Sequence, residues 1–149
     1  MSNTEIQIIT TSQSPDAKPV VKNLTLTVDW QTLVSVPKYE VPELVFGGDT
    51  IIVPGVGEVI SPLIIANRTI TTERVSVRVF RIEDTELETG NYYYLANQVA
   101  IPAYDVLAFP LNGQFFYPGD LLEVSCSANN AFDVTLSYTI GQAEQDDVA

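Results

Sequence analysis

The sequence has no histidine and a single cysteine, and these absences exclude much of enzyme chemistry. Histidine is the commonest general base and the commonest transition-metal ligand, so Ser-His-Asp and Cys-His arrangements are impossible and a zinc site is close to excluded. Cys126 has no partner for an internal disulfide, and its place on the inward side of a predicted strand indicates a small buried side chain. The composition therefore gives no support to nucleophilic or zinc-dependent catalysis.

Basic residues are scarce as well. The chain has 7 Lys and Arg residues against 19 Asp and Glu residues, which gives a net charge of -12. Phosphate binding needs clustered Lys and Arg, and anionic lipid surfaces attract the same side chains, so we expect neither nucleic acid nor a membrane as a partner. Self-repulsion at this charge keeps free subunits soluble and makes any assembly sensitive to salt.

Long apolar runs and targeting signals are also missing from the sequence. No segment approaches the ~20 apolar residues that a membrane span requires. The first five residues are polar and include no basic region ahead of an apolar run, so no signal peptide is predicted. Together with the single cysteine, this leaves nothing in the sequence that points to an oxidising compartment.

The sequence does contain strong period-two alternation, above all in its last third. Leu122, Val124 and Cys126 alternate with Leu121, Glu123 and Ser125, and a second alternating set begins at Phe132 and ends at Ile140. Such alternation places one set of side chains on a core and the other in water or against a neighbour. The residues 117–120, Tyr-Pro-Gly-Asp, form the turn before these strands. The pattern predicts the following inward-facing set: Leu122, Val124, Cys126, Ala128, Phe132, Val134, Leu136, Tyr138 and Ile140.

Similar strands recur along the chain, with turn signals about 8–12 residues apart. This spacing is typical of a β-sandwich or jelly roll, so we predict an all-β, two-sheet antiparallel sandwich, jelly-roll-like, with eight or nine strands. We divide the chain into an extended N-terminal arm (1–20), a β-sandwich domain (21–141) and an acidic flexible tail (142–149). In the domain, the strands expected before the last hairpin are 24–30, 41–46, 50–53, 58–67, 74–82, 98–101 and 106–109, and the segment 33–36 either continues 24–30 or forms its hairpin partner. The arm has one further candidate strand at 6–10.

Only carboxylates remain as candidates for chemistry. With 19 acids some pairs will be neighbours by chance, so a glycosidase-like carboxylate pair is a weak hypothesis. The segment 83–90 has acids at Asp84, Glu86 and Glu88 before Gly90, which faintly resembles a calcium loop, but the spacing fails the EF-hand pattern. A solvated acidic loop between strands is the simpler interpretation. We therefore predict no catalytic, cofactor-binding or metal-binding residues and a non-enzymatic protein.

Two aromatic triplets are candidates for an interface. At least one residue of a triplet on a strand should point away from its own core, and an outward tyrosine is a good interface anchor. Ordinary core packing with one exposed ring, or a carbohydrate-binding surface, would also account for them. The interface candidates are Tyr92, Tyr93, Tyr94, Phe115, Phe116 and Tyr117.

A series of structural motifs runs through the second half of the chain. It begins with an apolar strand and a small-polar turn at 63–69, continues with a Val-rich strand at 75–82, and reaches Ile101-Pro102-Ala103. An apolar strand at 106–111, the turn Pro118-Gly119-Asp120, the small-residue stretch 125–131 and a closing strand complete it. With these motifs, residues 58–141 resemble a recurring β-sandwich domain of tailed-bacteriophage virion proteins.

This resemblance implies a small structural protein of the virion, either a capsid decoration or cement protein or a neck or tail accessory protein. Such proteins act by repetition in symmetric rings or lattices, so the expected partners are other virion proteins and copies of the chain itself. The rigid sandwich would carry the arm, whose residues Glu5 to Pro19 would dock on a neighbour. The alternative is a carbohydrate- or receptor-binding module of a tail or fibre, and a carboxylate hydrolase is a third hypothesis.

Overall fold

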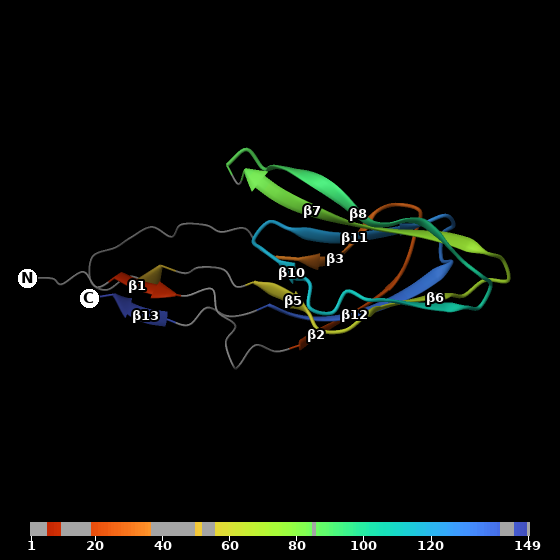
Figure 1. Cartoon of the computed structure of the whole chain (residues 1–149), viewed down its shortest axis with the longest axis horizontal. Coiled ribbons are helices and arrows are strands. Elements are labelled where there is room, and N and C mark those ends of the chain that lie inside the picture. The colour runs from red at the N-terminus through yellow and green to blue at the C-terminus, as the bar shows by residue number, and fades with distance from the viewer. Residues whose placement is uncertain are drawn as a thin grey trace, which may run out of the picture.

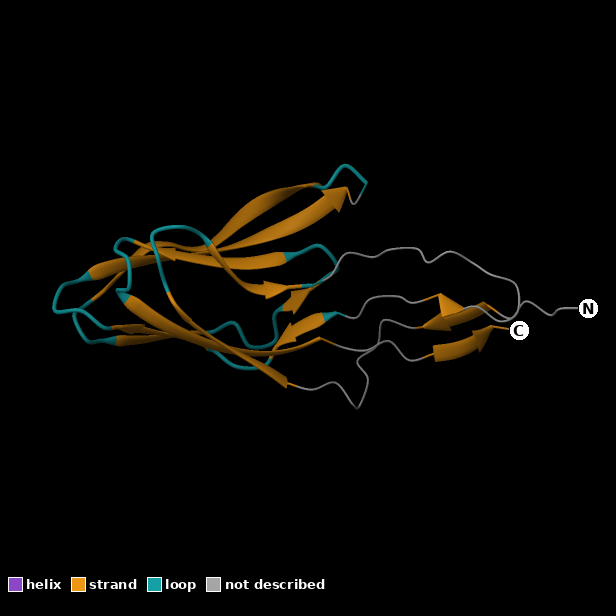
Figure 2. Ribbon diagram, turned by 180° about the vertical axis from the view of Figure 1, so that it is seen from behind, coloured by secondary structure: helices purple, strands orange, loops and turns teal. Residues whose placement is uncertain are grey.

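The computed structural model describes residues 6–9, 19–36, 50–51, 56–84, 86–140 and 145–148, with side chains for 19–36, 56–84 and 86–140. Within these ranges the chain forms strands and loops and no helix (Figure 2). Two antiparallel sheets pack against each other, as Figure 1 shows. The prediction of an all-β, two-sheet sandwich is confirmed.

The first sheet has six strands, and β12 (Phe132–Ile140) lies at its centre. One side of β12 pairs with β2, and the other side pairs with β6 and β5. The order is β10-β5-β12-β6-β9, with β2 added on β12. Its other strands are β2 (Pro19–Thr25), β5 (Gly57–Val59), β6 (Leu63–Asn67), β9 (Val106–Phe109) and β10 (Phe115–Phe116).

The second sheet has four strands in the order β3-β11-β7-β8. They are β3 (Gln31–Ser35), β11 (Leu121–Cys126), β7 (Glu73–Asp84) and β8 (Thr89–Ile101). The two long strands form a hairpin, and β8 lies at the edge of this sheet in the described part of the chain. Figure 1 shows the tip of the β7–β8 hairpin standing away from the rest of the sandwich.

A short third sheet has the order β13-β1-β4. Its strands are β1 (Ile6–Ile9), β4 (Thr50–Ile51) and β13 (Gln145–Val148). The predicted arm and the predicted tail thus each contribute a strand, and these pair antiparallel with each other. Residues 145–148, expected in a flexible tail, form a strand because β1 supplies an antiparallel partner for their backbone groups. Three predicted segments lie outside the described residues: the rest of the tail, residues 1–5 and 10–18 of the arm, and the strand expected at 41–46.

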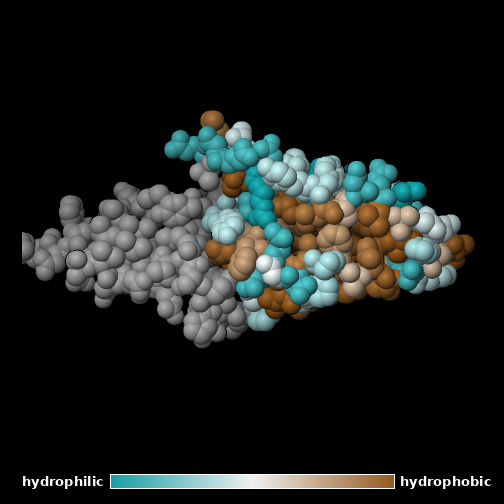
Figure 3. Space-filling model, viewed as in Figure 1, coloured by the Kyte–Doolittle hydropathy of each residue, from teal (hydrophilic) through white to brown (hydrophobic). Residues whose placement is uncertain are grey.

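The core lies between the two large sheets, and the predicted alternation is confirmed there. The inward residues of β11 and those of the first half of β12 are buried, while Tyr138 and Ile140 are half-buried. The three inward valines of β7, at 75, 77 and 79, are buried with them. Figure 3 shows hydrophobic residues gathered along the middle of the sandwich, with hydrophilic residues around them.

The strand expected at 24–30 is shorter than predicted, because β2 ends at Thr25. Beyond it, side chains take over the backbone hydrogen bonding: the Thr27 amide donates to Gln31 Oε1 at 2.8 Å, and the Asp29 amide donates to Thr27 Oγ1 at 3.3 Å. Such local side-chain bonds compete with a strand ladder and favour a loop. The loop brings Trp30 to the start of β3, where it takes part in the surface described below.

One buried amide fixes the turn at 67–71, which belongs to the motif at 63–69. Asn67 Nδ2 donates to the carbonyl oxygens of Thr71, Ile101 and Pro102 at 2.9, 2.9 and 3.1 Å. Its Oδ1 accepts hydrogen bonds from the amide and the hydroxyl of Thr69. A buried amide satisfied in this way stabilises the turn because none of its polar groups is left without a partner.

Candidate interaction surface on the four-stranded sheet

Three of the candidate residues lie on β8, and the register with β7 decides which face each one occupies. Tyr92 pairs with Phe80 and Tyr94 with Arg78, whereas Tyr93 pairs with the buried Val79. Residues directly opposite each other in an antiparallel pair share a face. Tyr92 and Tyr94 therefore lie on the side of the sheet that faces away from the core, which we call the outer face.

A compact group of side chains occupies the outer face, and Arg78 is at its centre. The Arg78 guanidinium carbon lies 3.8 Å from the centre of the Trp30 ring and 3.9 Å from the centre of the Tyr92 ring. Tyr94 meets Trp30 edge to face, with ring centres 5.9 Å apart. Arg78 Nε donates to Glu123 Oε1 at 2.9 Å. We call Trp30, Arg78, Tyr92, Tyr94 and Glu123 the outer-face cluster.

The electrostatics of this cluster keep Arg78 charged. Burial lowers the pKa of its guanidinium, but hydrogen bonds with Glu123 and Tyr94, together with the charge of Glu123, more than offset that effect and raise the pKa. A cation held between two rings is attracted to both of their faces. The cluster thus fixes the positions of Tyr92 and Tyr94 while leaving much of each ring in solvent, which is the preorganisation that a binding surface needs.

All three tyrosines of the triplet are about half exposed: 50% for Tyr92, 50% for Tyr93 and 53% for Tyr94. Tyr92 and Tyr94 lie on the outer face, while Tyr93 is on the core-facing side of the hairpin. The same strand also exposes Leu95 and Val99. At least one tyrosine was expected to point away from the core, and the structure confirms this.

The second aromatic triplet divides between core and surface. Phe115 and Tyr117 are exposed, but Phe116 is 0% exposed and packs in the core. The assignment of Phe116 as an interface residue is therefore wrong. The physical reason is the alternation along β10: Phe116 faces Gly57 of β5, and its neighbours take the opposite side.

Arg81 connects the two triplets. In β7 it pairs with Asn91, the residue before Tyr92. Its Nη1 donates to the Phe115 carbonyl oxygen at 2.8 Å and to Asp120 Oδ2 at 2.7 Å. The β7–β8 hairpin is thereby tied to β10 and to the turn at 117–120.

A pocket of about 320 Å³ opens on the four-stranded sheet next to the outer-face cluster. The sequence reasoning missed it, although the uncharged polar pair Asn97-Gln98 interrupts the apolar pattern of β8. Gln98 has a φ of 50°, a left-handed conformation that is uncommon outside glycine. Its amide donates to Ser76 Oγ at 2.9 Å, and its carbonyl oxygen accepts from Arg74 Nη1 at 3.1 Å. Among the lining residues are Trp30, Arg74, Tyr94, Asn97, Gln98 and Ser125.

Cys126 also borders this pocket, and it is buried as predicted. Its thiol lies 3.0 Å from the Ala128 carbonyl oxygen, to which it donates a hydrogen bond. Burial raises the pKa of the Cys126 thiol, so the protonated form is favoured. A nucleophilic cysteine needs the opposite shift, and the sulfur is therefore structural.

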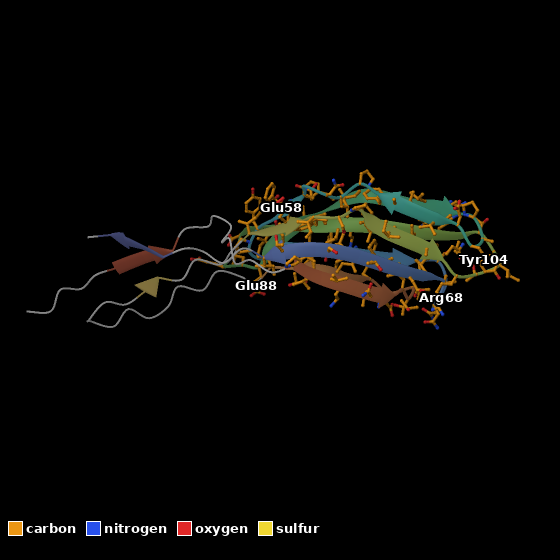
Figure 4. All side chains as sticks on the ribbon, turned by 90° about the horizontal axis from the view of Figure 1, so that it is seen from below. Glu58, Arg68, Glu88 and Tyr104 are labelled. Carbon is orange, nitrogen blue, oxygen red and sulfur yellow. The ribbon has the colours of Figure 1, made fainter. Side chains whose placement is uncertain are left out.

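The acidic segment 83–90 forms the tip of the hairpin. Asp84 Oδ1 accepts hydrogen bonds from the amides of Glu86 and Leu87 at 2.9 and 3.0 Å, which closes the turn. Figure 4 shows Glu88 of this turn at the same end of the sandwich as Glu58, far from Arg68 and Tyr104. In the described part of the chain, His, Cys, Asp and Glu side chains form no group of three or more that could hold a metal ion.

Comparisons with protein-family models, with curated proteins and with solved structures found no match for this chain. The described residues contain no helix that is long and apolar enough to cross a membrane. Function is therefore inferred from the surface of the sandwich and from its chemistry.

Proposed function

We propose that this chain is a non-enzymatic structural component of a bacteriophage particle, a capsid decoration or cement protein or a neck or tail accessory protein. It acts through repeated contacts with copies of itself and with other virion proteins. It assembles in the host cytoplasm and ends in the virion, without binding nucleic acid or membrane. The resemblance of residues 58–141 to virion sandwich domains supports this proposal.

The observation that carries the proposal is the composition and exposure of β8. None of its 13 residues is charged, although the chain as a whole has a net charge of -12. Five large apolar or aromatic side chains of this strand are exposed, at positions 92, 93, 94, 95 and 99. Interface centres are enriched in aromatic residues and depleted of charge, whereas ordinary solvated surface of an acidic protein is not.

The rigidity of the surface supports an assembly role as well. The outer-face cluster holds two tyrosines through Arg78, and the ion pair between Arg81 and the buried Asp120 ties the hairpin to the neighbouring turn. A surface that is already ordered loses little conformational entropy on binding. Many identical copies can then occupy equivalent positions in a ring or lattice.

The test is to look for the chain in purified particles and to ask whether the tyrosines hold it there. We expect mass spectrometry to detect the chain in washed particles. The variant with Tyr92, Tyr93 and Tyr94 all changed to Ser should be lost from them. Tyr104→Ser is the matched control, because Tyr104 is 66% exposed but lies in a loop outside β8. Absence of the wild-type chain from particles would overturn the proposal.

The pocket supports a second candidate function, a carbohydrate- or receptor-binding module of a tail or fibre. Two aromatic rings, an arginine, two amides and serine hydroxyls converge there, and such a set suits a neutral polyhydroxylated ligand. A glycan array with the full chain would test this function. Binding that is lost in Asn97→Ala and kept in Asn112→Ala, an exposed turn residue away from the pocket, would support it; no binding to any glycan would reject it.

A further inference from the structure

The edge of the four-stranded sheet lacks the charges and prolines that commonly protect an edge strand, and the bulges in the pairing of β8 with β7 leave one regular stretch of that edge uninterrupted. Free edges are commonly blocked by Lys, Pro, other charges or very short strands, because their unpaired backbone groups can add a further strand. The edge strand β8 is 13 residues long, uncharged and free of proline. In the described part of the chain it pairs with β7 alone.

The part of β8 best suited to pairing is the segment 90–94. Here the register with β7 runs without interruption, and irregularities lie on both sides, between Ile82 and Asp84 and between Val77 and Arg78 of β7. A regular stretch presents its alternate backbone N–H and C=O groups in line along the free edge. The five uninterrupted pairs are Gly90–Ile82, Asn91–Arg81, Tyr92–Phe80, Tyr93–Val79 and Tyr94–Arg78.

We propose that this segment pairs with the same segment of a second copy of the chain, antiparallel, about a two-fold axis at Tyr92. The two four-stranded sheets then become one continuous eight-stranded sheet. A two-fold axis makes the contact self-complementary and closes the assembly at that edge. The inference rests on the proposed function, because that function requires contacts between copies of the chain. It specifies which strand makes one of those contacts.

The side chains of 90–94 fit this register. Tyr92 meets Tyr92 of the second copy, and cross-strand aromatic pairs stabilise antiparallel sheets. Gly90 of one copy falls opposite Tyr94 of the other, so each Tyr94 ring can lie over the glycine that it faces. Aromatic side chains cover edge glycines in this way. Gly90 has no room for a side chain of its own, because a Cβ there would lie 2.1 Å from the Arg81 carbonyl oxygen.

The charges beyond the segment fit it too. Glu86 lies six residues before Tyr92, and Gln98 lies six residues after it. Glu86 lies in the hairpin turn just before β8 begins at Thr89, and the axis places Thr89 opposite Leu95, so this turn of one copy lies toward Gln98 of the other. Arg74, an exposed residue, donates to the Gln98 carbonyl oxygen at 3.1 Å.

The acidic hairpin tip of each copy therefore reaches an arginine of the other, and symmetry makes this contact twice. In a chain with a net charge of -12, most approaches of two copies place acids against acids. An uncharged strand flanked by Glu86 on one side and Arg74 on the other avoids that repulsion. Complementary charges of this kind also fix the register of the contact.

The first experiment measures the mass of the full chain by light scattering over a range of concentrations. We expect a dimer or a larger species containing it, and Tyr93→Lys should weaken dimerisation at least about tenfold, because the axis places like charges near each other. Tyr93 has no part in the Arg78 stack, so the variant should remain folded, which circular dichroism would verify. Tyr104→Lys, the same change at an exposed tyrosine outside β8, should dimerise as the wild type does.

A charge exchange tests the register. Arg74→Glu and Glu86→Arg should each weaken dimerisation, and the double variant should recover most of the loss, because the pair is restored in the opposite sense. Independent surface effects would instead add. If the double variant is weaker than both single variants, the proposed register is wrong.

A disulfide tests the axis directly. Facing residues of an antiparallel pair have Cβ atoms about 5 Å apart, so Tyr92→Cys should form an intermolecular disulfide on mild oxidation. Tyr104→Cys should not, and the native Cys126 is buried and should not interfere. No disulfide in the Tyr92→Cys variant, together with unchanged mass in Tyr93→Lys, would overturn the inference even if the chain oligomerises by another surface.

The outcomes separate this inference from the proposed function. The pairing of two copies would be overturned by oligomers whose mass is unchanged in the β8 variants, or by a chain that stays monomeric at every concentration. It would also be overturned if β8 bound a different protein instead of a second copy. The particle test would still decide the proposed function. Conversely, a β8-linked dimer from a chain that is absent from particles would support the pairing and reject the virion role.

Discussion

Arg81 and Asp120 form a short ion pair, 2.7 Å between Nη1 and Oδ2, around a carboxylate that is only 2% exposed. The same carboxylate accepts hydrogen bonds from the Tyr117 amide at 2.8 Å and the Ile82 amide at 3.2 Å. One side chain thus satisfies a guanidinium and two backbone amides from two separate segments. It fixes the turn at 117–120 against the strand β7.

Asp120→Ala should be strongly destabilising, because it removes the carboxylate partner of Arg81 and leaves both amides without their acceptor. We expect a loss of about 3–5 kcal/mol in the free energy of unfolding, measured by urea denaturation. Asp105→Ala is the control: Asp105 is exposed, and its carboxylate accepts a hydrogen bond from the adjacent Val106 amide. Its loss should be below about 1 kcal/mol. Equal losses would show that the Asp120 ion pair does not stabilise the fold.

Two glycines with nearly the same backbone conformation separate strain from steric contact. Gly113 has a φ of 88° and Gly119 a φ of 91°, so alanine is strained at both. A Cβ on Gly113 would meet no atom within 4 Å, whereas on Gly119 it would lie 2.8 Å from Ile82 Cγ2. Gly113→Ala should cost about 1 kcal/mol, and Gly119→Ala about 1–3 kcal/mol more. Urea denaturation would measure the difference, and equal costs would mean that Ile82 moves aside freely.

Arg78 and Arg68 allow a comparison of a half-buried with an exposed ion pair. The side chains of Arg78 and Glu123 are 15% and 13% exposed, against 48% and 53% for Arg68 and Asp133. Arg78→Met leaves Glu123 without its partner and removes the cation from Trp30, so we expect a loss of about 3 kcal/mol. Arg68→Met should cost less than about 1 kcal/mol.

Fluorescence gives a second readout for Arg78, since Trp30 is the chain's one tryptophan. Its emission should change in Arg78→Met and stay unchanged in Arg68→Met. A spectrum that is the same in both variants would contradict the stack between Arg78 and Trp30.

Period-two alternation was sufficient to predict the sandwich and most of its core. It identified the inward residues of β11 and β12 because both strands have one face on the core and one toward solvent. It failed at Phe116, since a run of adjacent aromatic residues has no polar neighbour to show which one faces inward. The register against Gly57 decides this, and register is a property of the pairing rather than of the strand.

The outer-face cluster could not be predicted from the sequence for a related reason. Its members come from four strands or their ends, and Arg78 and Glu123 are 45 residues apart. Their meeting depends on the strand order β3-β11-β7-β8, which alternation does not specify. The interface role of the tyrosines was predicted from their chemistry, whereas the pocket depends on a backbone irregularity at Gln98. In the sequence, the polar pair Asn97-Gln98 marks only a break in the apolar pattern and does not specify that irregularity.

Cys126 should make the stability of the fold depend on pH in the alkaline range. Burial raises the pKa of its thiol above the ordinary value of 9.0. As pH rises past that value, the unfolded chain releases the proton while the folded chain retains it, so unfolding becomes more favourable. The urea midpoint should therefore fall more steeply between about pH 8 and 10 in the wild type than in Cys126→Ala, whose remaining slope comes from other groups. Parallel slopes would show that the folded chain releases the proton as readily as the unfolded one.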